Sequence, residues 1–536
     1  MARVAQEQAS WRRDAIGLAG LLGLAAAIRV LAWSRTTVLF NDGPVLLSIA
    51  QAMGEGRWDE VFAHPFHPLY PLSVWLLGQG SLDPEVAGVV VSIAGGLLSI
   101  AALHVFWRTL FDRQVAWLGA WVVALHPSAV DFSSDVMSDG LYVGLYLAGL
   151  AALARAVMRP ALRPALLAGV FSGLAYWVRP EGVGLLIVAL VLLGLRAMRD
   201  GAERRRWLGA LAGLLLVGVL LASVYVAVVE SRTGEAALTR KKSIRGLVTG
   251  GAALPSSVLE TPERRIAAGA EASTVLLPEL AVRADGPGTR RPPSSLLGFA
   301  EANLRVLRTA SAAIRYELLP FVLLGLLALR GRESPWCRGV IVAPTLLYFG
   351  VLVLLVWGAG YVSRRHTLAL VLPWIGHAAV GWRWAAGRLA SKAPRWGDRV
   401  AAAGAPRWMV LALVMLLVVA WLPRDLRVRR GDRAAVRAAA EWLAEVHPDS
   451  GAVAAQKLRV AYYARAPFVP LPPGTDGQLR AILEQRGARW VVIDQAKLGD
   501  HTGLAEGLGG WLRPLHRIER AGHTALVLEV TPRAAG

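Results

Sequence analysis

The chain has 536 residues, of which 55% are hydrophobic and only 18% are charged. Its mean hydropathy of +0.46 is too high for an ordinary soluble domain, so composition indicates an integral membrane protein. The formal net charge of +20 does not indicate a nucleic-acid partner, because Lys and Arg lie mainly in short runs between apolar segments. The single cysteine, Cys337, excludes an intramolecular disulfide framework and gives no thiolate metal site.

Apolar segments recur along most of the chain. A bilayer core of about 30 Å needs about 20 apolar helical residues, and these segments lack the alternation of membrane β-strands. We therefore predict an α-helical polytopic membrane protein with about eleven spans. The first span is too long for the apolar part of a signal peptide, and no cleavage site of small residues follows it. In chain order the spans are residues 15–33, 86–107, 115–125, 141–157, 165–178, 182–195, 208–229, 318–329, 340–357, 368–382 and 408–422.

Three of these segments, the third, fifth and sixth, are short for a full crossing, which is typical of tilted or re-entrant helices that line a cavity. The charges of the connecting segments predict how all the spans are oriented in the membrane. With the N-terminus in the cytoplasm, the inner segments hold 22 Lys and Arg against 7 acids, and the short outer segments hold 5 against 10. We therefore expect a multi-pass membrane protein whose N-terminus is cytoplasmic and whose C-terminus is extracytoplasmic.

Two domains are predicted. Residues 1–423 form the transmembrane domain, with a first outer loop at 34–85 that includes a juxtamembrane helix, and a large outer loop at 230–315. Residues 424–536 are more polar and alternate between helix and strand patterns, which predicts a small extracytoplasmic α/β domain. Its helices are RAAVRAAAEWLAEV and LRAILEQRG, and its strands are GAVAAQ, ARWVVIDQ and HTALVLEV.

Asp42 lies in the first outer loop, in the sequence FNDGPVLLSIAQAM. A carboxylate at the edge of a low-dielectric region can be tuned to act as a general base or can anchor an acceptor hydroxyl. The same residue, followed by Gly43 and Pro44, is also good chemistry for the start of a helix. The residues alone leave both interpretations open.

Three more acids precede the fourth span, in DFSSDVMSDGLY. Asp135 and Asp139 are four residues apart, so a helix would present both on one face. Either is a candidate second carboxylate, and either could instead be the acidic start of a helix, where the macrodipole favours it.

His64 and His67 lie three residues apart in the proline-stiffened segment HPFHPLYP, which cannot form a regular helix. Metal ligation, a hydrogen bond to substrate and simple loop packing are all open, since this spacing is weak evidence for a metal site. A divalent cation stays an open question, and the sequence indicates no other cofactor.

Cationic side chains fall on the same predicted outer side. Arg179 and Glu181 join the fifth and sixth spans in YWVRPEG, and Arg364 and Arg365 precede the tenth in YVSRRHTLALVLP. Two arginines can hold a phosphate bidentately, although arginines also extend to the membrane interface without binding a ligand. Arg29, inside the first span, has the same two interpretations. Lys241 and Lys242 of the large outer loop are further candidates for a lipid phosphate. A cavity that these groups line would bind a substrate that is anionic and partly lipid.

In this order, these motifs resemble the C-type polytopic glycosyltransferases, specifically bacterial members related to protein O-mannosyltransferases and the aminoarabinose transferase. The resemblance covers about residues 15–382. It implies transfer of a sugar from a polyprenyl phosphate carrier to a lipid, glycan or protein acceptor at the outer leaflet. A distal extracytoplasmic module also fits such members.

The resemblance also implies roles for individual residues. Asp42 takes the place of the first-loop catalytic acid, although Gly43 replaces the second acid that many relatives have. Asp139 matches the second-loop acid better than Asp135 does. Arg179 matches the arginine of an RPEG-like turn, Arg364 matches a basic residue before a proline-containing helix, and His64 or His67 would replace a lysine of the aminoarabinose enzymes.

These roles are compatible with a single inverting displacement. Asp42 would take the acceptor proton, and Arg364, Arg365, Lys241 or Lys242 would stabilise the leaving phosphate. The main alternative is a transporter or flippase of a lipid-linked or anionic substrate, since ionisable groups within spans are also typical of those proteins. A sugar-binding membrane protein without activity is a third interpretation, which Gly43 favours.

Overall fold

The computed structural model describes residues 2–240, 296–392, 405–448, 451–471, 476–500, 502–508 and 510–531. These residues divide into two compact units. The described part of the first unit comprises residues 2–32, 50–240, 296–392 and 405–426. The described part of the second comprises residues 33–49 and those from 427 onward.

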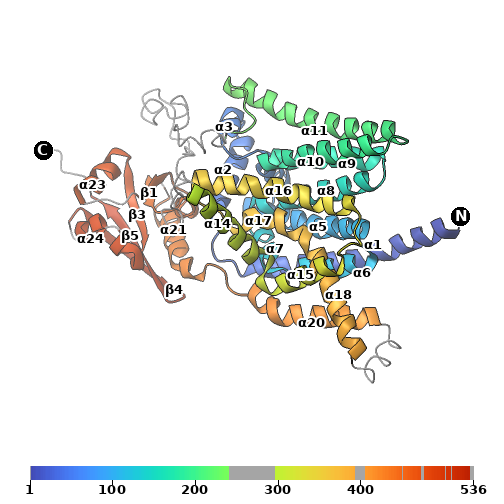
Figure 1. Cartoon of the computed structure of the whole chain (residues 1–536). Coiled ribbons are helices and arrows are strands. Elements are labelled where there is room, and N and C mark those ends of the chain that lie inside the picture. Colours follow the sequence, from blue (N-terminus) through green and yellow to red (C-terminus); the bar gives the residue numbers. More distant parts are fainter. Residues whose placement is uncertain are drawn as a thin grey trace. The chain divides into compact units, whose positions relative to one another are not determined.

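The first unit is helical (Figure 1). Its elements, with the ends of α1 and α2 that pass into the second unit, are α1 (Ala2–Ser34), α2 (Gly43–Gly54), α3 (Trp58–Ala63), α4 (Leu69–Gly78), α5 (Pro84–Leu110), α6 (Arg113–Ala124), α7 (Pro127–Ser133), α8 (Ser138–Met158), α9 (Leu162–Val178), η1 (Pro180–Val183), α10 (Gly184–Arg199), α11 (Arg204–Thr233), α14 (Leu296–Ile314), η3 (Tyr316–Leu318), α15 (Leu319–Ala328), α16 (Pro335–Ala359), α17 (Arg364–Val371), η4 (Leu372–Trp374), α18 (Ile375–Lys392) and α20 (Ala405–Asp425).

The predicted helical polytopic fold is confirmed, and each of the eleven predicted segments falls on helical residues, although residues 368–382 divide over α17, η4 and α18. Among the described residues, six helices are long and apolar enough to cross a membrane, or up to eight if each of two bent pairs forms one span. The six are Asp14–Ser34, Pro84–Leu110, Ser138–Met158, Pro180–Arg199, Arg204–Thr233 and Pro335–Ala359. Length and apolarity therefore support fewer crossings than the predicted eleven.

Each of the two bent helix pairs has a distinctive backbone conformation at its bend. Helices α6 and α7 meet at 57°, where Pro127 follows and His126 has the extended backbone that a residue before proline prefers. The segments before and after Arg315 meet at 82°, and Arg315 has a positive φ of 76° that ends α14.

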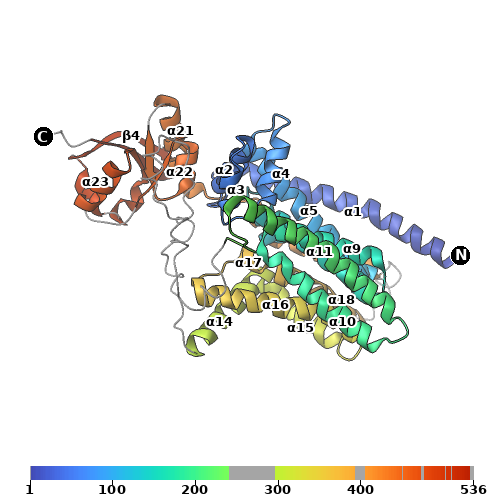
Figure 2. The ribbon, with the colours of Figure 1, turned by 90° about the horizontal axis from the view of Figure 1, so that it is seen from above.

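Glycines allow close helix packing beside the candidate site. A Cβ added to Gly95 of α5 would lie 2.4 Å from the backbone of Gly140 in α8, and a Cβ on Gly144 would lie 2.3 Å from the Gly95 carbonyl oxygen. Backbone contact of this kind is typical of membrane helix pairs with small residues at the interface. Helices α9, α10 and α11 form a neighbouring group, seen in both views (Figures 1 and 2).

The second unit contains a five-stranded sheet of order β2-β1-β3-β5-β4. Strands β1, β2 and β3 are parallel, and β5 pairs antiparallel with both β3 and β4. Its elements are η5 (Gly431–Arg433), α21 (Ala434–Val446), β1 (Ala452–Ala455), α22 (Leu458–Tyr463), β2 (Phe468–Pro470), α23 (Asp476–Gln485), β3 (Ala488–Asp494), η6 (Gln495–Asp500), α24 (Thr502–Gly507), β4 (Leu512–Arg520) and β5 (His523–Val530).

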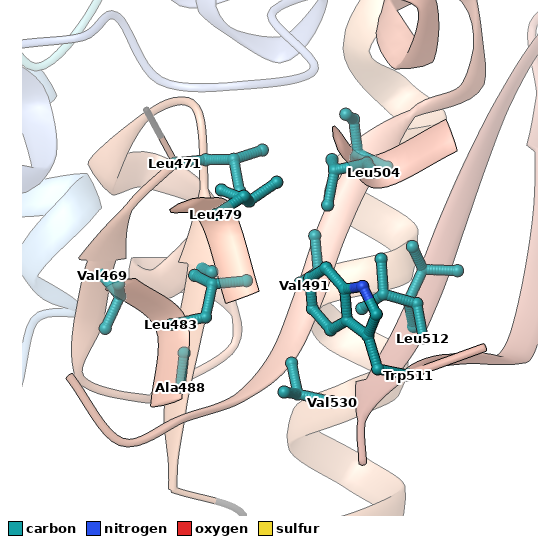
Figure 3. Close-up of a cluster of buried hydrophobic side chains, with 13 residues drawn as sticks. Val469, Leu471, Leu479, Leu483, Ala488, Val491, Leu504, Trp511, Leu512 and Val530 are labelled. Atoms are coloured by element: carbon teal, nitrogen blue, oxygen red, sulfur yellow. The ribbon is translucent and has the colours of Figure 1, made fainter. Parts of the chain in front are cut away.

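Alternation along the strands explains how the sheet is covered. In β5, Leu528 and Val530 join a core with α23 and α24 on one face (Figure 3), while Ala525 and Val527 are buried on the other face, which α21 covers. The predicted α/β domain is thus confirmed, with all five predicted elements present. Prediction missed β2, which has three residues, and β4, whose sequence LRPLHRIER is mostly exposed and lacks a buried pattern.

Candidate functional site

A buried cluster of opposite charges lies within the first unit. Asp139 is 1% exposed, and its Oδ1 atom lies 2.8 Å from an Nη atom of Arg179. Its Oδ2 atom lies 3.8 Å from an Nη atom of Arg365. Three segments that are far apart in the sequence therefore meet at one carboxylate.

Local backbone signals position these three side chains. Asp139 lies in the first turn of α8, where the helix dipole stabilises a negative charge. Arg179 ends α9 with an extended backbone, as expected for the residue before Pro180. Arg365 lies in the first turn of α17, which begins with a capping box between Ser363 and His366.

Aromatic and acidic groups surround the Arg179 guanidinium. It lies over the ring of Tyr142, 5.5 Å from the ring centroid, in a cation–π arrangement. Glu181 of η1 and Tyr348 of α16 also interact with it electrostatically. Tyr142 and Tyr348 were not predicted, although Tyr142 follows Asp139 by three residues and so lies on the same helix face.

A small cavity adjoins Asp139. Its volume is about 10 Å³, which is about the space that one water molecule needs. The carboxylate therefore faces a confined space, and its nearest charged neighbours are the two arginines. The cavity is lined by Gly96, Ser99, Ala129, Phe132, Ser133, Asp139, Gly140, Val143, Leu368 and Leu372.

The other predicted residues of these loops lie in different surroundings. Arg364 is exposed at the first position of α17. Asp135 is 2% exposed, and its carboxylate accepts a hydrogen bond of 2.8 Å from the backbone nitrogen of Val136. Arg364 is thus an exposed cation next to the largely buried Arg365, while Asp135 lies inside the protein.

The HPFHPLYP segment is anchored to neighbouring helices. His67 Nδ1 donates a hydrogen bond of 2.6 Å to the Tyr176 carbonyl oxygen of α9, and the His67 ring stacks on Tyr225 with centroids 4.5 Å apart. The hydroxyl of Tyr70 donates to the Gly88 carbonyl oxygen of α5 at 2.8 Å. This geometry favours loop packing for His67 over the other interpretations that the sequence left open.

His64 makes a local contact instead. Its Nδ1 atom accepts a hydrogen bond of 3.1 Å from the backbone nitrogen of Phe66, and the two rings stack. Within the described ranges, no group of three or more His, Cys, Asp or Glu side chains is arranged to hold a metal ion.

Arg29 is fully buried in α1. Its Nε atom donates to Ser133 Oγ at 2.8 Å, and one Nη atom donates to the Ala124 carbonyl oxygen at 3.3 Å. These contacts join α1 to the end of α6 and to the end of α7, so Arg29 does not extend to the interface.

Asp42 belongs to the second unit and is half-buried. Its carbonyl oxygen accepts a hydrogen bond from the backbone nitrogen of Leu46 in α2, as expected at a helix start. Lys241 and Lys242 lie outside the described residues.

The segment before Asp42 is held by arginines of the C-terminal domain. Arg437, Arg430 and Arg459 donate to the successive carbonyl oxygens of Thr37, Val38 and Leu39, at 2.8, 2.5 and 3.2 Å. Tyr463 accepts a hydrogen bond of 3.0 Å from the backbone nitrogen of Leu39. Sequence reasoning missed this attachment, because its two sides lie about 400 residues apart and neither carries a motif.

Two comparisons with known proteins found similarities. Residues 63–226 match the family model described as dolichyl-phosphate-mannose-protein mannosyltransferase. The structure of ArnT from Cupriavidus metallidurans bound to undecaprenyl phosphate covers 95% of this chain and 97% of its own, with a TM-score of 0.57 and 12% sequence identity. The structure of the same protein in the apo state covers 96% of this chain and 98% of its own, with a TM-score of 0.58 and 14% sequence identity. The archaeal oligosaccharyltransferase AglB from Archaeoglobus fulgidus, in complex with an inhibitory peptide and a dolichol-phosphate, matches 96% of this chain and 74% of its own (TM-score 0.54, 14% identity). No curated protein sequence matches significantly.

The solved structures show that the chain has the fold of ArnT. The family match covers α4 to α10 and most of α11, and it includes Asp139 and Arg179. It confirms the predicted relationship to protein O-mannosyltransferases. Residues 63–226 are therefore similar to the dolichyl-phosphate-mannose-protein mannosyltransferase family of membrane glycosyltransferases.

Proposed function

We propose that the chain transfers a sugar from a polyprenyl phosphate carrier to a lipid, glycan or protein acceptor at the outer face of a bacterial inner membrane. The observation that carries this proposal is the family match over the region that holds Asp139 and Arg179. The carrier class is supported by the ArnT and AglB structures of the same fold, which contain undecaprenyl phosphate and a dolichol-phosphate. The outer-face assignment rests on the charge bias of the loops.

The reaction is a single displacement. The acceptor oxygen forms a bond to the anomeric carbon, the bond from that carbon to the phosphate oxygen breaks, and the acceptor proton moves to the Asp42 carboxylate. The leaving group is the polyprenyl phosphate anion, so cations fixed in advance lower the barrier. Attack opposite the leaving group inverts the configuration of the sugar carbon.

Arg364 and Arg365 have different parts in this proposal. Arg365 is held near Asp139, which Arg179 also contacts, so the buried carboxylate positions two guanidinium groups. Arg364 is exposed at the adjacent position and is the residue we assign to the leaving phosphate. Lys241 and Lys242 are further candidates for that phosphate. Asp139 acts as a positioning charge, since its confined surroundings suit two arginines better than an acceptor hydroxyl.

The proposed site has four further residues in supporting roles: Glu181, Asp135, His64 and His67. Glu181 adds a negative charge beside Arg179, and His67 anchors the first outer loop to α9. We assign Asp135 and His64 to the shape of the loops around the substrate.

The matched pair Asp42→Asn and Asp59→Asn tests the role of Asp42. Both acids lie in the first outer loop, but the Asp59 side chain is 76% exposed and pairs with Arg232. With purified protein and a labelled polyprenyl phosphate sugar, we expect Asp42→Asn to lower kcat by about 100-fold or more, because a general base typically contributes that much. Asp59→Asn should retain activity. An Asp42→Asn variant as active as the wild type would remove Asp42 from the mechanism.

A further inference from the structure

The carboxyl ends of β1 and β3 form a switch point in the C-terminal sheet. The two strands are parallel neighbours, with Ala454 opposite Val491. After β1 the chain enters α22, which contacts α21 on one face of the sheet. After β3 it enters η6, whose Leu498 packs with the core on the opposite face. The two connections therefore leave in opposite directions, and open α/β sheets bind ligands between such connections.

Four cations gather at this switch point. Lys457 and Arg459 follow β1, Lys497 lies in η6 after β3, and Arg433 ends η5 before α21. Their places in the sheet bring them to the same end of β1 and β3, and the charges of Arg459, Lys497 and Arg433 all act on Lys457. Arg459 is 7% exposed, Lys457 and Arg433 are half-buried, and Lys497 is exposed. This group of four, termed the switch-point cluster, therefore has a buried arginine and an accessible lysine.

Positive charge exceeds negative charge within the switch-point cluster. Asp432 lies 3.5 Å from Arg433, and the Asp494 carboxylate at the end of β3 accepts a hydrogen bond from the Ala496 backbone. Burial, together with the charges of Arg433 and Arg430, lowers the pKa of Arg459 to about 10. Burial and its cationic neighbours also lower the pKa of Lys457. A bound anion would relieve this mutual repulsion, and two lysines with a fixed guanidinium suit a phosphate.

We propose that the switch-point cluster, formed by Arg433, Lys457, Arg459 and Lys497, binds a phosphate group. This site belongs to the C-terminal domain and stands independently of the transfer reaction proposed above. The phosphate could be carried by a water-soluble molecule or by the headgroup of an anionic lipid. Lys457 and Lys497 would contact the ligand, while Arg459 is held by its hydrogen bond to the Leu39 carbonyl oxygen.

The test compares two double variants of the full-length protein in a neutral detergent. Lys457→Ala with Lys497→Ala removes the two lysines of the cluster. Arg486→Ala with Arg489→Ala removes two exposed cations near the opposite end of β3 and serves as the control. No sugar donor is present, so the outcome does not depend on transfer activity. Thermal unfolding confirms that each variant is folded.

Two probes distinguish the sources of the phosphate. Binding of inorganic phosphate is measured by the broadening of its phosphorus NMR line. Binding of phosphatidylglycerol is compared with binding of phosphatidylcholine by native mass spectrometry. We expect at least one probe to bind the wild type and the control, with about tenfold or greater weakening in the lysine variant. Binding of inorganic phosphate alone would indicate a soluble ligand, and selective retention of phosphatidylglycerol would indicate a lipid headgroup. Equal binding by both double variants, or binding of neither probe by the wild type, would overturn the proposal.

Discussion

Asp139 is a buried ion-pair partner of two arginines and also belongs to the proposed site. A carboxylate that is 1% exposed needs cationic partners, because removing a charge from water costs several kcal/mol. Arg179 and Arg365 supply them from two other loops. The ion pair with Arg365 also fixes the start of α17, where the adjacent Arg364 is the residue we propose for the leaving phosphate.

The buried pair predicts a large effect on stability. We expect Arg179→Met to lower the free energy of unfolding by about 3–5 kcal/mol, because it leaves Asp139 buried with a partner missing. Arg206→Met is the matched control, since Arg206 pairs with Glu203 at 2.9 Å but its side chain is 72% exposed. That variant should change stability by less than about 1 kcal/mol. Denaturant unfolding in detergent measures both, and equal effects would contradict a structural ion pair at Asp139.

The sequence predicted the side chains of this cluster but not their pairing. Charge bias and motif order placed Asp139, Arg179 and Arg365 on one side of the membrane. Which arginine contacts Asp139 depends on how deep α9 and α17 lie and how each helix is rotated about its axis. The periodicity of apolar residues predicts neither the depth nor the rotation. Arg364 and Arg365 are therefore indistinguishable in sequence, although one is exposed and the other lies near Asp139.

At the scale of elements, the contact between α5 and α8 supports the site. Ser92 of α5 donates to the Met137 carbonyl oxygen just before α8, and the Tyr70 hydroxyl lies 2.9 Å from Ser92 Oγ. The start of α8, and with it Asp139, is thus fixed to α5 and to the HPFHPLYP segment. The sequence predicted both helices. Their residues show no alternation or heptad pattern that would have predicted the contact between them.

Glycine substitutions test this helix contact. Gly95→Ala would place a Cβ 2.4 Å from the Gly140 backbone, so we expect it to destabilise the protein by about 1–3 kcal/mol and to reduce transfer activity. Gly194→Ala in α10 is the control, because a Cβ there meets nothing within 4 Å. Alanine is the better helix former, so the control should be neutral or slightly stabilising. If both variants unfold at the wild-type midpoint, α5 and α8 do not pack as described.

At the scale of the whole molecule, the loop before Asp42 and the C-terminal domain form one unit. Residues 33–49 group with the residues after 426, and Thr36 forms a β-bridge with Arg429. The C-terminal domain therefore holds the segment before Asp42. A sequence pattern could predict the domain itself from its alternating strands, but contacts across about 400 residues leave no local signal.

Hydrogen exchange tests this attachment. Arg437 and Arg480 each pair with a glutamate four residues later, at 2.7 and 2.9 Å, but Arg437 also donates to the Thr37 carbonyl oxygen. We expect Arg437→Ala to speed amide exchange at Thr37 and Leu39 and to lower kcat, while Arg480→Ala changes neither. Unchanged exchange in the Arg437→Ala variant would show that the arginine does not hold the loop.

The central claim is that the protein breaks the bond between a sugar and a polyprenyl phosphate. The most direct measurement reconstitutes the purified chain in vesicles with a labelled donor and its acceptor, and follows free polyprenyl phosphate and glycosylated acceptor by mass spectrometry. We predict that the two products appear in equal amounts in wild-type vesicles and form about 100-fold or more slowly with Asp42→Asn. Movement of intact donor from one leaflet to the other, with no release of polyprenyl phosphate, would contradict the claim and identify a flippase instead.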